Sequence, residues 1–234
     1  MHGRGAARAG AAPRLGGDGL ATSRTVEDSR RPGACLSAIG KQVPRWRPAG
    51  RGFEGVAGMT TKETRSLAAI AEALARKPFY GNTMGLASNL KPLVAHFAPA
   101  PLSEFDGKWC AAFVYHCAAV AGLGLPPRHP RPVSCSFAAV RGWLEWAKLP
   151  GNRFYHSARQ SGFAPRRGDL VVFDRLFDPG PHDHMGVVLA ADGGALRVAE
   201  GNVNNLSAVV RRPRNAHVRG YVRIPRGYTY VPAP

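Results

Sequence analysis

Residues 109–117 read Trp-Cys-Ala-Ala-Phe-Val-Tyr-His-Cys and follow the helix-breaking pair Asp106-Gly107. An apolar run that starts directly after such breakers predicts a buried helix with Cys110 in its first turn. The N–H groups of a first turn and the positive end of the helix dipole stabilise a thiolate more than a thiol. Cys110 is therefore the candidate nucleophile. Cys117, seven residues later on the same helix face, is expected to be a small buried hydrophobe.

Two polar positions further along the chain could supply the partners that a thiol nucleophile needs. His184 precedes the apolar residues 185–188, and Glu200 ends the next apolar segment. Neighbouring antiparallel strands place the start of one opposite the end of the other, so His184 and Glu200 are expected to face each other. The carboxylate would then fix the imidazole tautomer that presents its other nitrogen to sulfur. Asn202, two residues beyond Glu200, would serve the same face if the strand stays extended there.

His182 is a second candidate for the base, because it is two residues from His184 and would share its side of a strand. His184 is favoured because it directly adjoins the apolar strand, whereas His182 follows Pro181 in a loop. The two histidines, with Asp178 or Asp183, could instead bind zinc. A convincing fourth ligand is missing from this set, and we expect neither a metal ion nor a cofactor.

The charge of the chain points to polyanions. The 234 residues include 32 Lys and Arg against 15 Asp and Glu, which gives a formal net charge of +17. Nucleic acids and the anionic polymers of a cell envelope would both attract such a protein. The arginines are scattered and no nucleic-acid-binding motif is found, so no specific nucleic-acid partner is expected.

The first quarter of the chain differs in composition from the rest. Residues 1–58 are rich in Gly, Ala, Arg and Pro and show no sustained helical or strand periodicity. Such a segment buries too little apolar surface to offset its chain entropy, so we expect it to be a disordered leader. It could be an organelle transit peptide, but its composition favours Met59 as the true start, with the preceding stretch a translated upstream region. No apolar run resembles a secretory signal or the roughly 20 residues of a spanning helix. We expect the protein to be made in the cytoplasm and to act elsewhere only after release or delivery.

Residues 59–234 carry the folding signals, with helices first and strands after. Residues 60–63 match a capping box ahead of a helix that ends at Lys77, and further helices are expected around residues 84–97 and 137–149. Short apolar segments separated by turns then predict strands at 169–173, 185–190, 195–199, 207–211 and 218–223. This order predicts an α+β domain in which N-terminal helices pack on a C-terminal antiparallel meander.

Four motifs together resemble the CHAP family, the cysteine- and histidine-dependent amidohydrolase/peptidases. They read WCAAFV at 109–114, PRRGDLVVF at 165–173, HMGVV at 184–188 and EGN at 200–202. They follow the order of that family, within a stretch of about residues 79–225. The resemblance implies a papain-like α+β fold. It also implies cleavage of amide bonds in peptidoglycan, either between N-acetylmuramic acid and L-alanine or within the stem peptide and cross-bridge.

The resemblance also implies roles for individual residues. Cys110 would be the nucleophile, His184 the general base and then the general acid, and Glu200 the residue that orients the imidazole. Asn202 would occupy the further polar position of the site. These are the four catalytic residues that the sequence predicts.

The predicted function is that of a cysteine-dependent amidase or endopeptidase that cleaves peptidoglycan through a thioacyl-enzyme. Its expected partners are peptidoglycan stem peptides, with non-specific attraction to anionic envelope polymers, and the protein is expected to be a monomer with no membrane span. Two alternatives stay open. One is a thiol amidase acting on a small amide or a protein, and the other is a non-catalytic domain that binds polyanions or the envelope through its charge.

Overall fold

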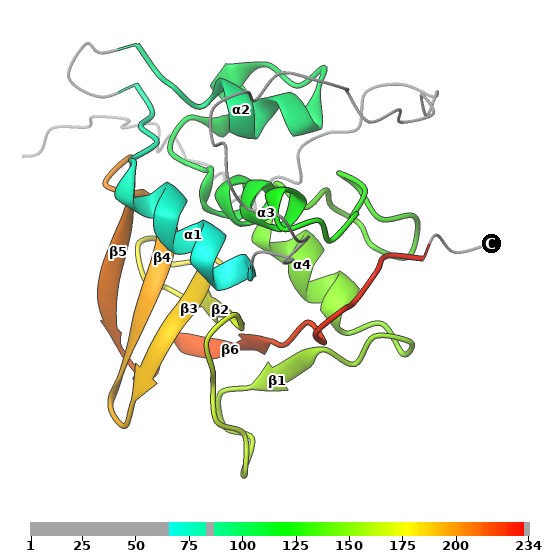
Figure 1. The fold of residues 1–234 in the computed structure, drawn as a ribbon, viewed down its shortest axis with the longest axis vertical. Coiled ribbons are helices and arrows are strands. Elements are labelled where there is room, and N and C mark those ends of the chain that lie inside the picture. Colours follow the sequence, from blue (N-terminus) through cyan, green and yellow to red (C-terminus); the bar gives the residue numbers. More distant parts are fainter. Residues whose placement is uncertain (1–65, 83–86, 232–234) are drawn as a thin grey trace, which may run out of the picture. The chain divides into compact units, whose positions relative to one another are not determined.

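The computed structural model describes residues 66–82 and 87–231. The leader expected at residues 1–58 and the capping box at residues 60–63 lie outside the described residues. Within them, helices precede a six-stranded antiparallel sheet (Figure 1), which confirms the predicted α+β class. No helix in this part of the chain is both long and apolar enough to cross a membrane.

Helix α1 spans Leu67–Arg76 and begins at Ser66. The Ser66 hydroxyl accepts a hydrogen bond from the backbone N–H of Ala69 at 3.3 Å. A serine in this position satisfies one of the free N–H groups of a first turn. The helix therefore begins after Ser66.

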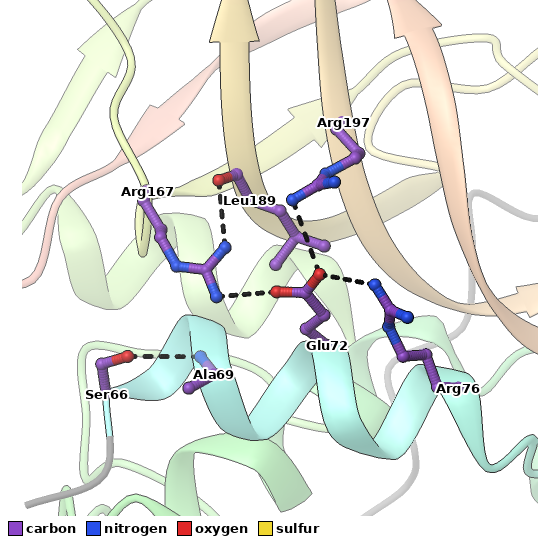
Figure 2. Close-up of polar contacts among 7 residues, drawn as sticks. All are labelled: Ser66, Ala69, Glu72, Arg76, Arg167, Leu189 and Arg197. Atoms are coloured by element: carbon purple, nitrogen blue, oxygen red, sulfur yellow. Dashed lines mark hydrogen bonds and ion pairs between the residues drawn. The ribbon is translucent and has the colours of Figure 1, made fainter.

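Glu72 ties α1 to the sheet (Figure 2). Its carboxylate accepts hydrogen bonds from Arg167 at 2.7 Å, Arg76 at 3.1 Å and Arg197 at 3.5 Å. Arg167 lies in the turn before the second strand and also donates to the carbonyl oxygen of Leu189 at 3.2 Å. Half-exposed ion pairs of this kind contribute about 0–1 kcal/mol each. Their main effect is to fix where α1 lies on the sheet.

Short helical turns lead the chain to the central helix. Helix α2 spans Lys91–Val94, and two 3-10 turns span Ala95–Phe97 and Leu102–Phe105. The helix predicted around residues 84–97 is therefore shorter and begins next to Pro92. A proline lacks the N–H that a helix interior requires but fits a first turn, where that group has no partner.

Helix α3 spans Cys110–Val120 and begins at the predicted residue. It ends ahead of Gly122, whose φ of +81° is the left-handed conformation that commonly terminates helices. Helix α4 spans Val140–Ala147, a shorter helix than the one predicted at residues 137–149.

The strands are connected mostly as predicted, with one addition. Their bounds are β1 Tyr155–Ser157, β2 Leu170–Phe173, β3 His184–Asp192, β4 Ala195–Val203, β5 Leu206–Pro213 and β6 Val218–Val222. The order in the sheet is β1-β6-β2-β3-β4-β5, and all pairs are antiparallel. The predicted meander holds for β2 to β5, but β6 returns beside β2. The sequence did not predict β1, because three residues are too few to show a period of two.

Buried side chains lie on both faces of the central strands β2, β3 and β4. Helices α1 and α3 cover one face of β3 and β4 (Figure 1), where alternate strand residues such as Val187 and Ala199 join the main core. The opposite face carries a second cluster of Val171, Phe173, Val188, Leu196, Val198, Val218 and Tyr221. Because side chains alternate along a strand, His184 and Glu200 lie on the side of this second cluster.

Candidate active site

Cys110 is the first residue of α3 and is only 6% exposed. Two side-chain hydrogen bonds fix the chain just before it. Asn202 donates its amide N–H to the carbonyl oxygen of Gly107 at 2.7 Å, and the indole of Trp109 donates to the Asn205 side-chain oxygen at 3.0 Å. Both asparagines come from the end of β4 and the turn that follows it. The start of α3 is thus held against that end of the sheet.

Gly201 allows α3 to approach β4 this closely. A Cβ atom on Gly201 would lie 2.5 Å from Phe113 Cβ and 2.9 Å from Trp109 Cζ3. Contacts that short do not occur between packed carbon atoms, so a side chain here would force the helix and the strand apart.

His184 and Glu200 meet across β3 and β4. His184 Nε2 lies 2.8 Å from Glu200 Oε2, and the two side chains are 1% and 0% exposed. Glu200 pairs in register with Gly186, so the imidazole and the carboxylate are diagonal neighbours on one face. A Cβ atom on Gly186 would lie 2.7 Å from Glu200 Cγ. The glycine therefore leaves the space through which the Glu200 side chain reaches His184.

Cys110 is the other partner of His184. Burial is the largest single influence on the pKa of His184 and lowers it. The negative charge of Cys110 and its hydrogen bond, together with those of Glu200, outweigh burial and raise this pKa to about 10. Because Nε2 faces Glu200, Nδ1 is the nitrogen left to face the sulfur. Such a pKa favours the imidazolium form of His184 at neutral pH.

Arg212 is a member of the site that sequence reasoning missed. From β5 it donates Nε to Glu200 Oε1 at 3.0 Å and Nη2 to Glu200 Oε2 at 2.7 Å. Burial alone would raise the pKa of Glu200, but the bonds to His184 and Arg212 lower it overall. The sequence contains many arginines, and nothing next to Arg212 in the chain marks it as part of a site. Strand alternation could have found it, since Arg212 shares a side of β5 with Ala208, the residue that pairs with Glu200.

Phe177 is a second residue that the sequence did not single out. Its ring stands edge to face with the His184 ring, with centroids 4.8 Å apart at 84°. The guanidinium carbon of Arg212 lies 5.1 Å from the centroid of the same ring. Phe177 is 49% exposed, so one part of it covers the buried charges while another part faces solvent.

His182 lies outside this group of contacts. Its Nδ1 is 3.2 Å from Asp174 Oδ1, and its φ of +57° places it in a turn rather than in β3. Asp183, one of the suggested zinc ligands, accepts hydrogen bonds from the backbone N–H groups of Phe177 and Asp178. Among residues 66–82 and 87–231, no three His, Cys, Asp or Glu residues are grouped to hold a metal ion.

Asn202 does not share the face of His184, which corrects one expectation. Its φ is +63°, and the pairing of β4 with β5 shifts between Glu200 and Val203. The extended conformation on which the expectation depended is lost there. The Asn202 side chain points instead to the turn before α3, where it bonds Gly107.

The comparison with protein families agrees with the geometry. Residues 103–202 match the family model of the CHAP domain, a stretch that includes Cys110, His184 and Glu200 and ends before Arg212. The chain has no significant match among curated proteins or among solved structures. The family match supports a hydrolase that acts on amide bonds. The resemblance seen in the sequence is therefore confirmed, and the family that residues 103–202 match is the CHAP domain family.

Proposed function

We propose that this protein is a cysteine-dependent amidase or endopeptidase that cleaves amide bonds of bacterial peptidoglycan. One observation carries the proposal: the buried series of contacts from Cys110 through His184 to Glu200, set at the start of a helix. A thiol beside an imidazole that a carboxylate orients is the arrangement that activates a cysteine nucleophile. The CHAP match of the surrounding residues favours an amide substrate.

In the proposed reaction the Cys110 thiolate attacks the amide carbonyl, and the His184 imidazolium gives its proton to the amine as the C–N bond breaks. The resulting thioacyl-enzyme is then attacked by water, whose proton His184 accepts. Release of the acid product restores the thiolate and the imidazolium. Because the pKa of His184 is raised, the proton is already on the imidazole before attack, so His184 acts first as an acid.

The backbone N–H of Cys110 is the proposed donor to the oxyanion that forms during attack. It lies at the start of α3, where first-turn N–H groups have no partner within the helix. Glu200 is proposed to orient the imidazole and to stabilise its charge. Asn202, through Gly107, is proposed to fix the turn that precedes the nucleophile rather than to touch the reacting groups.

The proposed substrate is the peptide portion of peptidoglycan, on which the protein acts as a monomer after release or delivery to the wall. The formal charge of +17 favours contact with the anionic polymers that accompany such walls. The charge would raise the local concentration of enzyme and contribute no bond specificity.

The test compares the full-length wild type with Cys110→Ala and a matched control, Cys117→Ala, on purified peptidoglycan from several bacterial types. Cys117 is a buried thiol of the same helix and has no part in the proposed site. We expect the wild type and the control to clear the suspension and release amines, and Cys110→Ala to do neither. Mass spectrometry of the fragments identifies the bond that is cut. If all three proteins fold and none clears any wall, the proposal is overturned.

A further inference from the structure

The carboxylate of Glu200 has two ionisable partners among the described residues, His184 from β3 and Arg212 from β5. Oε2 accepts hydrogen bonds from both, at 2.8 Å from His184 Nε2 and 2.7 Å from Arg212 Nη2, while Oε1 accepts from Arg212 Nε at 3.0 Å. The two contacts with Arg212 form a planar fork. A fork fixes the plane of the carboxylate, and with it the direction in which Oε2 faces His184.

The guanidinium is itself held in place. It lies between the Glu200 carboxylate and the ring of Phe177, 5.1 Å from the ring centroid, and its side chain is only 16% exposed. The chain around Phe177 is fixed by Asp183, which accepts hydrogen bonds from the N–H groups of Phe177 at 2.7 Å and Asp178 at 3.1 Å. Arg212 therefore has little freedom to leave Glu200.

Glu200 needs such a partner because it is fully buried. A carboxylate without solvent takes up a proton unless charged or hydrogen-bonding groups stabilise its ionised form. His184 alone gives Oε2 a single bond and gives Oε1 none. A neutral Glu200 would no longer balance the charge of the imidazolium, and the imidazolium in turn would stabilise the thiolate of Cys110 less well.

We propose that Arg212 is a positioning residue that keeps Glu200 ionised and holds its Oε2 toward His184. The inference rests on the proposed function, since it assigns Arg212 to the same site. Arg212 acts on the nucleophile through Glu200 and His184 and touches no reacting atom. It lies ten residues beyond the end of the CHAP match at residue 202, so the matched stretch does not include it.

The variants are Arg212→Met and Arg212→Lys in the full-length protein. Met removes the charge and the fork, whereas Lys keeps the charge and offers only a single point of contact. Arg211→Met is the matched control, because Arg211 directly precedes Arg212 in β5 and makes one exposed contact of 3.5 Å with Asp192. Glu200→Gln marks the full effect of losing the carboxylate. Circular dichroism spectra show at which pH each variant is folded, and the variants are compared only under those conditions.

The first measurement is the ionisation of Glu200 itself, by infrared spectra recorded against pH, and it needs no substrate. We expect the band of the protonated carboxyl, which Glu200→Gln lacks, to appear at higher pH in Arg212→Met than in the wild type. Arg212→Lys should lie between them, and Arg211→Met should match the wild type. An Arg212→Met spectrum that titrates like the wild type overturns the inference.

The second measurement is the rate at which iodoacetamide alkylates Cys110 as a function of pH. At neutral pH we expect Arg212→Met to react about 10–100-fold more slowly, the range found when the hydrogen-bond partner of a metal-bound histidine is removed. The acid limb of its profile should shift toward higher pH, with partial recovery in Arg212→Lys. If Arg212→Met keeps the wild-type profile while Glu200→Gln does not, Arg212 has no positioning role. An unreactive Cys110 in the wild type would count against the proposed function instead, and the infrared result would still decide the inference.

Discussion

The substitution Gly201→Ala tests how the fold brings Cys110, the proposed nucleophile, close to His184. The added Cβ would lie 2.5 Å from Phe113 Cβ, about 1 Å inside an ordinary carbon contact, and would also meet the ring of Trp109. Overpacking of a buried site costs about 1–3 kcal/mol. Alanine also restricts the unfolded chain, which recovers about 0.4–1 kcal/mol at a compatible backbone conformation. The overpacking is the larger effect at the middle of each range, so the free energy of unfolding should fall by about 1 kcal/mol.

The assay is urea unfolding followed by tryptophan fluorescence, with Gly151→Ala as the control. A Cβ atom on Gly151 meets nothing within 4 Å, so that variant should be as stable as the wild type or slightly more stable. A displaced α3 would also carry Cys110 away from His184, and the pKa of His184 should fall in Gly201→Ala. The reasoning is refuted if Gly201→Ala and Gly151→Ala unfold at the same urea concentration.

Three further predictions concern charged groups. Cys110→Ala removes the largest influences that raise the pKa of His184, and histidine NMR titration should show it at least one unit below the wild type; an unchanged value would contradict the assigned contact. The His184 pKa rises on folding from 6.5 to about 10, so its contribution to stability is complete below about pH 6.5 and is lost as pH rises toward 10. The Glu200 pKa is lowered from 4.5, so its contribution to stability is lost as the pH falls into the acid range. The urea concentration at the midpoint of unfolding should therefore decrease at both acid and alkaline pH, and a midpoint that stays constant at alkaline pH would contradict this. Asp169→Asn removes the charge and one of the two acceptors that Arg223 bonds at 2.9 and 2.7 Å, and it should cost about 1–3 kcal/mol in urea unfolding without affecting the titration of His184.

Features that depend on neighbours in the sequence could be predicted. The start of α3 at Cys110 follows from breakers and an apolar run that are adjacent in the chain. The hairpin of β3 and β4 follows from a short turn between two apolar segments, and it brings His184 near Glu200 because hairpin strands are antiparallel.

The sequence predicts that Glu200 faces His184, but it does not reveal the bulge on which this placement depends. The register that starts at Asp192 and Ala195 would, if continued, pair Glu200 with Val187, whose side chain faces the helices. A shift between Val188 and Ala190 pairs Glu200 with Gly186 instead and places it on the side of His184. A shift of the pairing register by one residue moves every later side chain to the other face of the sheet. No residue type in this segment predicts the bulge that causes the shift.

Arg212 escaped prediction for a related reason. Its Cα pairs with Leu196, four residues along β4 from Glu200, and only the length of the side chain brings the guanidinium to the carboxylate. Asn202 was assigned to the wrong side because asparagine, unlike most residues, readily adopts a positive φ, and the strand turns there. Strand alternation gives the side of β5 on which Arg212 lies but not the reach of its side chain, and it gives no sign of the positive φ at Asn202.

The residues of the candidate site come from both sides of the sheet. Cys110 lies on the side of the sheet that the helices cover, at the end of β4, where Gly201 allows α3 to come close. His184, Glu200 and Arg212 lie on the opposite side. Contact between the two groups occurs at the end of the sheet, where β3 begins with His184. The charge on the imidazole can then be stabilised on its far side by a fully buried carboxylate, and water reaches neither partner easily. In the proposed reaction, a histidine whose pKa is raised in this way would carry the proton that the leaving amine needs.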